Sequence, residues 1–105
     1  MRIISRKILK KFWQIHHDAE QSLKAWFAET ENAEWKHANE LKEQFRSASI
    51  ITNKRVVFNI KGNRYRLVVD IEYQFGIVFI VWIGSHIEYD KIKVKEISYD
   101  KTYKK

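Results

Sequence analysis

One stretch, residues 55–90, limits most strongly what this chain can fold into. It contains all three glycines of the chain and its longest apolar runs. Residues that favour strands, such as Val, Ile, Phe and Tyr, alternate there with short turn sequences. Glycine and asparagine tolerate positive φ, so Lys61-Gly62-Asn63 and Gln74-Phe75-Gly76 predict tight turns. The stretch therefore predicts a meander of hairpins with three strands: Arg55–Ile60, Tyr65–Tyr73 and Ile77–Ile83.

The side chains of these strands alternate between two sets, as the two faces of a sheet require. Val56, Phe58 and Ile60 form an apolar set in the first strand. In a half-buried antiparallel sheet this set faces the core and the other set faces water. We expect the wet face to carry these polar side chains: Arg55, Asn59, Lys61, Arg64 and Arg66. Such a face is either an ordinary solvated surface or a binding site for a polyanion.

The charge of the chain favours a polyanion as its partner, because the formal net charge is +7. Residues 1–16 contain five basic and no acidic residues, and residues 17–53 contain four basic and seven acidic residues. Residues 54–105 contain eleven basic and six acidic residues. This division favours one charged face over an evenly charged surface, although basic composition alone does not identify nucleic acid as the partner.

Composition excludes several kinds of site. The chain has no cysteine, which rules out a disulfide scaffold, a thiolate metal site and a cysteine nucleophile. Its length and its 45% hydrophobic residues suit a single folded domain over residues 1–105. No signal peptide is evident, and the longest apolar run, Ile77–Ile83, is too short to cross a bilayer as a helix. We therefore expect a cytoplasmic protein that does not enter the membrane and needs no metal or cofactor.

The N-terminal half predicts helices after a short edge strand in residues 1–4. Ser5 would cap a first helix over residues 6–16, and Asp18 with Gln21 resembles a capping box that starts a second helix. Residues 35–45 form a third candidate helix. Three tryptophans, expected in the core, occupy apolar positions of these helices: Trp13, Trp26 and Trp35. The whole pattern predicts an α+β domain with two or three helices packed on one face of an antiparallel sheet.

Side chains near the predicted strand ends have the chemistry that metal-free RNA cleavage requires. Arg66 would stabilise the extra charge of a phosphorane, and His86 would exchange a proton near neutral pH. Tyr89 offers a phenol for proton transfer, and Asp90 could orient a cation or an imidazole. Structural alternatives remain open for each: an ion pair of Arg66 with Asp70 or Glu72, a backbone contact for His86, and a core position for Tyr89.

Three segments of this stretch closely resemble the HigB toxin family: Val56–Asn63, Tyr65-Arg66-Leu67 and Gly84–Lys91. Trp35-Lys36 and Ser47–Ile50 extend the resemblance over nearly the whole chain. HigB toxins belong to the wider RelE-like group of toxin–antitoxin ribonucleases. The family usually has Thr where this chain has Ser85, a difference that keeps the hydroxyl group.

The resemblance implies a RelE-like fold and the toxin of a type II toxin–antitoxin system. Its activity would be ribosome-dependent cleavage of mRNA, by metal-independent attack of a 2′-hydroxyl on the adjacent phosphate. It implies catalytic roles for Arg66, His86 and Tyr89. Further residues are expected to position the RNA: Arg55, Asn59, Lys61, Asn63, Arg64, Asp90 and Lys91. The implied partners are the ribosome, mRNA and a HigA-like helix-turn-helix antitoxin, through which alone the toxin would reach operator DNA.

Two other functions remain open at this point. The first is a non-catalytic RNA-binding or ribosome-binding module that blocks translation by occupancy. It differs from a nuclease because neutralising His86 and Tyr89 would spare most of its affinity. The second is a small DNA-binding protein, which the sequence favours less because it has no helix-turn-helix pattern and its cations concentrate on strands.

Overall fold

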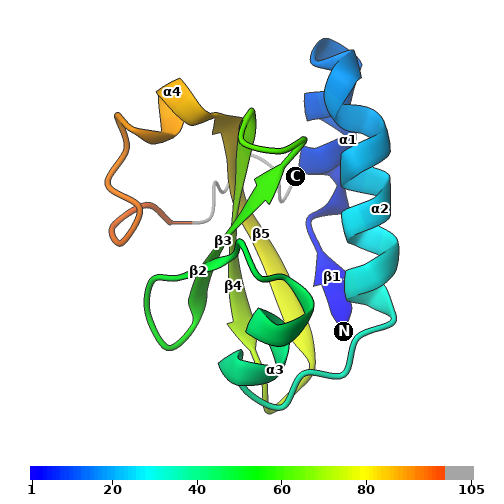
Figure 1. The fold of residues 1–105 in the computed structure, drawn as a ribbon, viewed down its shortest axis with the longest axis vertical. Coiled ribbons are helices and arrows are strands. Elements are labelled where there is room, and N and C mark those ends of the chain that lie inside the picture. Colours follow the sequence, from blue (N-terminus) through cyan, green and yellow to red (C-terminus); the bar gives the residue numbers. More distant parts are fainter. Residues whose placement is uncertain (99–105) are drawn as a thin grey trace.

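A computed structural model describes residues 1–98 as five strands and several helices (Figure 1). Residues 99–105, which the single-domain prediction also includes, lie outside this described part. The elements in chain order are β1 (Arg2–Ile4), α1 (Arg6–Ile15), a 3-10 turn (His17–Ala19), α2 (Glu20–Glu31), α3 (Ala38–Gln44), β2 (Ser49–Ile50), β3 (Arg55–Ile60), β4 (Tyr65–Glu72), β5 (Ile77–Ser85) and α4 (His86–Tyr89). The predicted α+β class is confirmed.

The predicted meander forms the centre of the sheet. β3, β4 and β5 pair antiparallel within one or two residues of the expected bounds, and the strand order is β1-β5-β4-β3-β2. The first turn has positive φ at Lys61 and Gly62 rather than at Asn63. β1 pairs parallel with β5, so the sheet is mixed and not wholly antiparallel as expected. A parallel pair needs a long crossover connection, which the chain from α1 to β4 provides.

The main hydrophobic core lies between one face of the sheet and the helices α1, α2 and α3. Leu9 of α1, Leu23 of α2 and Leu41 of α3 are fully buried there. Trp26 and Trp35 are also buried, and the ring of Trp26 lies 5.3 Å from that of Phe58 on β3. The core positions predicted for these two tryptophans are therefore confirmed.

The opposite face of the sheet carries a second, smaller core, which we define as Val57, Val68 and Val81. These valines are 2%, 0% and 4% exposed. Three of the side chains that cover them, Tyr89, Val94 and Ile97, come from the chain after β5, and the others are Ile51 and Trp82. The prediction of one wet face is therefore wrong for its centre, because the segment after α4 returns across it.

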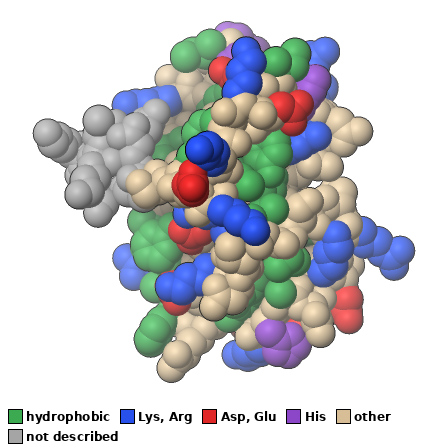
Figure 2. Space-filling model, turned by 90° about the vertical axis from the view of Figure 1, so that its left-hand side faces the viewer, with side chains coloured by type: hydrophobic (Ala, Val, Ile, Leu, Met, Phe, Trp, Pro, Cys, Tyr) green, Lys and Arg blue, Asp and Glu red, His purple; other side chains and the backbone are tan. Residues whose placement is uncertain are grey.

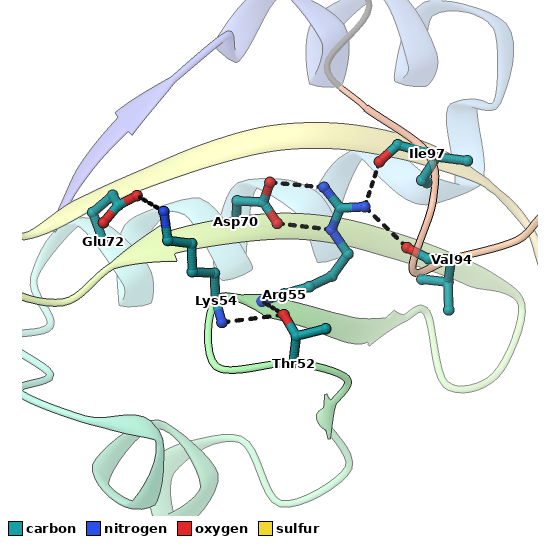
Figure 3. A network of polar contacts seen from close by, with 7 residues as sticks. All are labelled: Thr52, Lys54, Arg55, Asp70, Glu72, Val94 and Ile97. Carbon is teal, nitrogen blue, oxygen red and sulfur yellow. Dashed lines mark hydrogen bonds and ion pairs between the residues drawn. The ribbon is translucent and has the colours of Figure 1, made fainter.

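Arg55 fastens this returning segment to the sheet (Figure 3). Its Nε and Nη2 donate to the two carboxylate oxygens of Asp70 at 2.7 Å each, across the β3–β4 pair. Its Nη1 donates to the backbone carbonyl of Val94 at 3.0 Å and to that of Ile97. Arg55 is 8% exposed, so the expectation that it lies on a wet face is wrong. Its fixed fork satisfies acceptors that would otherwise be buried without a donor.

Both predicted helix caps of the N-terminal half are wrong. Ser5 has a left-handed conformation with φ of 75°, and its side chain makes no capping hydrogen bond to α1. α2 begins at Glu20, after a 3-10 turn that contains Asp18. The Asp18 carboxylate instead accepts hydrogen bonds from Arg64 and Tyr65, which lie far away in sequence. The side chain of Asp18, which the local pattern assigned to a helix cap, therefore makes a long-range contact with β4 and the turn before it.

Candidate functional site

Three neighbouring strands bring Asn59, Arg66 and Gly84 into one row across the sheet, which we call the Arg66 row. Arg66 of β4 is the register partner of Asn59 on β3 and of Gly84 on β5. Asn59 and Arg66 each lie two residues from a valine of the second core, so they occupy the same face of the sheet. The row therefore borders the second core where β3 ends and β4 begins.

Arg66 is half-buried and has no carboxylate partner among residues 1–98. Its Nη1 donates to the backbone carbonyls of Asn63 at 2.8 Å and Tyr65 at 3.3 Å. The two acids that might have neutralised it are occupied elsewhere. Asp70 binds Arg55, and Glu72 binds Lys54 at 2.6 Å. The guanidinium is thus held in place by neutral acceptors, and its positive charge is available to an anion.

Gly84, the register partner of Arg66 on β5, is packed closely against the ring of Trp82. A β-bulge in β5 shifts the register between Val68 and Val69, so that Val68 faces Trp82 and Val69 faces Ile80. The ring of Trp82 then lies against Gly84: a Cβ added there would be 2.5 Å from a ring carbon. Only glycine fits at this position without moving the indole.

α4 is fixed to the end of β5 by a capping box. The Ser85 hydroxyl accepts from the backbone N–H of Glu88 at 3.1 Å, and the Glu88 carboxylate accepts from the backbone N–H of Ser85 at 2.8 Å. The second of these bonds, with the Ser85 side chain next, lowers the pKa of Glu88 below its ordinary value. The hydroxyl that Ser85 shares with threonine is the group that makes this cap.

The capped helix places His86 and Tyr89 beside the Arg66 row. The backbone N–H of His86 donates to the Arg64 carbonyl at 3.0 Å, which ties the start of α4 to the β3–β4 turn. The Nδ1 atom of His86 is buried and has no hydrogen-bond partner within residues 1–98. The ring of Tyr89 lies 6.3 Å from that of Trp82.

The charge of Arg66 affects the pKa of Tyr89. Burial raises the pKa of the Tyr89 phenol, the positive charge of Arg66 opposes this rise, and the negative charge of Asp90 adds to it. Burial has the largest effect, so the phenol stays protonated at neutral pH. Tyr89 also packs against the second core, as the core alternative expected. Packing and a chemical role are compatible here, because the same contacts hold the phenol in position.

Some of the remaining predicted RNA contacts lie around this site, whereas Lys61 lines a hollow with residues of α2 and its charge acts on Asp18. Asn59 donates to the side chain of Asn63 at 3.3 Å, and Asp90 and Lys91 are exposed at the end of α4. Arg64, by contrast, forms a 2.6 Å ion pair with Asp18 on the helical side of the molecule. Arg55 lies beneath the C-terminal segment. The expectation that Arg64 and Arg55 share an exposed face with Arg66 is therefore wrong.

The sequence comparison settles the family. Residues 19–92, which include the whole candidate site, match the HigB_toxin family, described as the RelE-like toxic component of a toxin-antitoxin system. This chain belongs to the HigB family. No curated protein matches it in sequence. Membership confirms the resemblance drawn from the sequence and implies an antitoxin as partner of this HigB toxin.

The matched region leaves out β1 and α1, since it begins at the end of the 3-10 turn. Within residues 1–98, the HigB toxin has no group of three His, Asp or Glu side chains arranged to hold a metal ion. None of the helices described in it is long and apolar enough to span a membrane.

Basic side chains on the face nearest α4 and β2 do not form one continuous patch. Figure 2 shows them mixed with acidic and hydrophobic side chains over this side of the toxin. The division of charge along the chain had favoured a single charged face. The structure accounts for part of the difference, because Arg55 and Lys54 are both paired with acids on β4.

Several residues of the site were missed by sequence reasoning. Gly84 was named only as the start of a segment that resembles the family, and no local pattern shows that the indole of Trp82 covers it. Ser85 and Glu88 have the spacing of a capping box, and this signal could have predicted α4. Asp18 and Tyr65 form a contact between the 3-10 turn and β4 that no local pattern indicates.

Proposed function

We propose that this HigB toxin is an endoribonuclease that cuts mRNA on the ribosome and so inhibits translation in the cytoplasm. The observation that carries the proposal is the half-buried guanidinium of Arg66. It is held by backbone carbonyls, has no acidic partner in residues 1–98, and lies close enough to Tyr89 to affect its pKa. A fixed, unneutralised cation beside a protonated phenol suits the transfer of a phosphoryl group.

In the proposed reaction, the 2′-hydroxyl of the RNA attacks the adjacent phosphorus. The new P–O2′ bond forms, the P–O5′ bond breaks, and the products are a 2′,3′-cyclic phosphate and a 5′-hydroxyl. Arg66 stabilises the charge that develops on the non-bridging oxygens. Tyr89, protonated at neutral pH, gives a proton to the leaving O5′, and His86 takes part in removing the proton of the 2′-hydroxyl.

The proposed RNA contacts are the predicted residues whose side chains form no ion pair within residues 1–98: Asn59, Lys61, Asn63, Asp90 and Lys91. Arg55 and Arg64 are left out because their guanidinium groups are bound to Asp70 and Asp18. The further partners we propose are a HigA-like helix-turn-helix antitoxin, which alone brings the toxin to operator DNA, and the ribosome.

Primer extension on mRNA in a purified translation system tests this function. Arg66→Ala should reduce the cleavage rate by about 10²–10³-fold, as loss of a charge-stabilising donor does. Tyr89→Phe and His86→Ala should each cost roughly 10²–10⁴-fold. Arg64→Ala is the matched control, since it removes the same charge two residues away and should leave the rate within a few-fold. Co-sedimentation with ribosomes should be preserved in all four variants.

Other outcomes would change the conclusion. Translation arrest without cuts, by the wild type and every variant, would support the binding module that acts by occupancy. Cuts that persist in the Arg66 and Tyr89 variants would show that the chemistry lies elsewhere on this toxin.

A further inference from the structure

Six of the nine residues of β5 have no strand partner among residues 1–98 on the side away from β4. β1 pairs only with its first residues, through the register pairs Arg2–Ile77, Ile3–Val78 and Ile4–Phe79. At Ser5 the chain leaves the sheet through a left-handed residue and enters α1. β5 continues to Ser85, and within residues 1–98 no strand lies beside residues 80–85 on this side. Exposed strand edges of this kind readily pair with another chain.

A hollow of about 340 Å³ lies between this edge and α1. We call it the α1–β5 groove, and its lining is Ile8, Lys11, Phe12, Ile15, Val81, Trp82 and Ile83. Six of these seven side chains are apolar. Ile15 is 76% exposed although it lies on the same side of α1 as Ile8, seven residues earlier. A groove with an apolar lining and an open strand edge is suited to an extended peptide.

The charge around the groove indicates what kind of peptide fits. The groove has no acidic lining residue, Lys11 lines it, and Lys7 lies one turn before Lys11 on α1, which contains no acid. A segment that combines apolar and acidic side chains would complement both features. The toxin's own residues 99–105 do not have this composition, because they contain three lysines and one aspartate.

We propose that the α1–β5 groove receives an acidic, apolar segment of the antitoxin, which adds a strand beside residues 80–85 of β5. Its apolar side chains fill the space between α1 and Val81, and its carboxylates face the lysines of α1. This inference rests on membership of a toxin–antitoxin family and not on the ribonuclease mechanism. Arg66, His86 and Tyr89 do not line the groove, although Gly84 lies within residues 80–85 and Trp82, which lines the groove, also packs against Gly84. Docking in the groove therefore does not require the proposed catalytic residues.

Two matched variants test the proposal in the full-length toxin. Ile15→Glu places a negative charge in the groove at a side chain that is 76% exposed, so folding should be unaffected. Ile87→Glu makes the same change on α4, where the side chain is 61% exposed. The probe is the antitoxin co-expressed with the toxin from its own operon, and affinity is measured by calorimetry. Ile15→Glu should weaken binding by about tenfold or more, while Ile87→Glu stays within roughly twofold.

Hydrogen exchange supplies the second readout. Binding should protect amides of residues 80–85, and added salt should weaken binding because part of the attraction is electrostatic. Ile15→Glu should retain the RNA cleavage of the wild type. A toxin that cuts no RNA but binds antitoxin as described would therefore overturn the proposed function and leave this inference standing.

Three results would overturn the inference. One is undiminished affinity of Ile15→Glu, or loss of affinity only in Ile87→Glu, which would place the antitoxin over α4. Another is protection of residues 80–85 in the free toxin that disappears when residues 99–105 are deleted, which would make the chain's own tail the occupant. The last is concentration-dependent dimerisation abolished by Ile15→Glu, which would make a second copy the occupant.

Discussion

Replacing Arg55 with methionine should destabilise the protein strongly, because this side chain joins β3, β4 and the C-terminal segment. Methionine keeps most of the aliphatic length but removes four hydrogen bonds, two to Asp70 and two to backbone carbonyls. Removing one partner of a fully buried ion pair costs about 3–5 kcal/mol. The Asp70 side chain is 32% exposed, so water can partly solvate the carboxylate left behind. We expect a loss of about 2–4 kcal/mol in the free energy of unfolding.

Urea unfolding followed by tryptophan fluorescence measures this loss. A change of this size should lower the midpoint of thermal unfolding by roughly 10–20 °C in a domain of this length. Lys54→Met is the matched control. It breaks the neighbouring ion pair to Glu72, in which the lysine side chain is 55% exposed, and should cost far less because water screens an exposed pair.

The comparison of the two variants decides whether burial gives Arg55 its importance. Equal losses in Arg55→Met and Lys54→Met would refute the reasoning, since both pairs join the start of β3 to β4 but only Arg55 is buried and bound to the C-terminal segment. Arg55→Lys should also be destabilised, because an ammonium group cannot replace the planar fork that reaches Asp70 and the carbonyls together.

Three further predictions concern the rest of the site. Gly84→Ala should displace the ring of Trp82, shift its fluorescence and reduce RNA cleavage, because the new Cβ would lie 2.5 Å from that ring. Ser85→Ala should cost about 1 kcal/mol of stability by removing the cap of α4, whereas Ser85→Thr should be nearly neutral in the same unfolding assay. Hydrogen bonds, with that from Tyr65 the largest effect, lower the pKa of Asp18. The free energy of unfolding of the wild type should therefore exceed that of Asp18→Asn by its full amount above the ordinary aspartate pKa. This difference should disappear as the pH falls through the lowered pKa, and unfolding curves measured from pH 7 to pH 2 test it.

The parts of the fold that depend on neighbouring residues were predictable from the sequence. The β3–β4–β5 meander follows from turn residues and short β-favouring runs, which act within a few positions of one another. The burial of Trp26 follows from helical spacing. Trp35 is buried as expected, but the helix predicted over residues 35–45 begins only at Ala38, so Trp35 lies in the loop before α3. These features involve little competition from distant parts of the chain.

The parts that depend on distant residues were not predictable in the same way. Val57 and Val68 each lie two residues from polar side chains on their own face of the sheet, Arg55 and Asn59 for Val57 and Arg66 and Asp70 for Val68, which favoured a solvated face. The two valines are buried because a segment more than twenty residues later covers them. Arg55 is buried for the same reason, since two of its acceptors lie in that segment. The parallel β1–β5 pair likewise joins the two ends of the fold.

For the candidate site, the sequence identified Arg66, His86 and Tyr89 as residues of interest but not how they are held. The structure adds the backbone carbonyls that bind Arg66 and the capping box that fixes α4. It also separates Arg64 from Arg66, which a strict alternation had placed on one face. Arg64 precedes β4 and belongs to the turn, where alternation does not apply.

The central claim, that Arg66 is the charge-stabilising group of a ribonuclease, is tested most directly by a ratio of two rates. Single-turnover cleavage of ribosome-bound mRNA would be measured for Arg66→Ala and for Arg64→Ala under identical conditions. We predict that the Arg66 variant is slower by about 10²–10³-fold while its ribosome binding is unchanged. Equal rates for the two variants, with the wild type active, would contradict the claim.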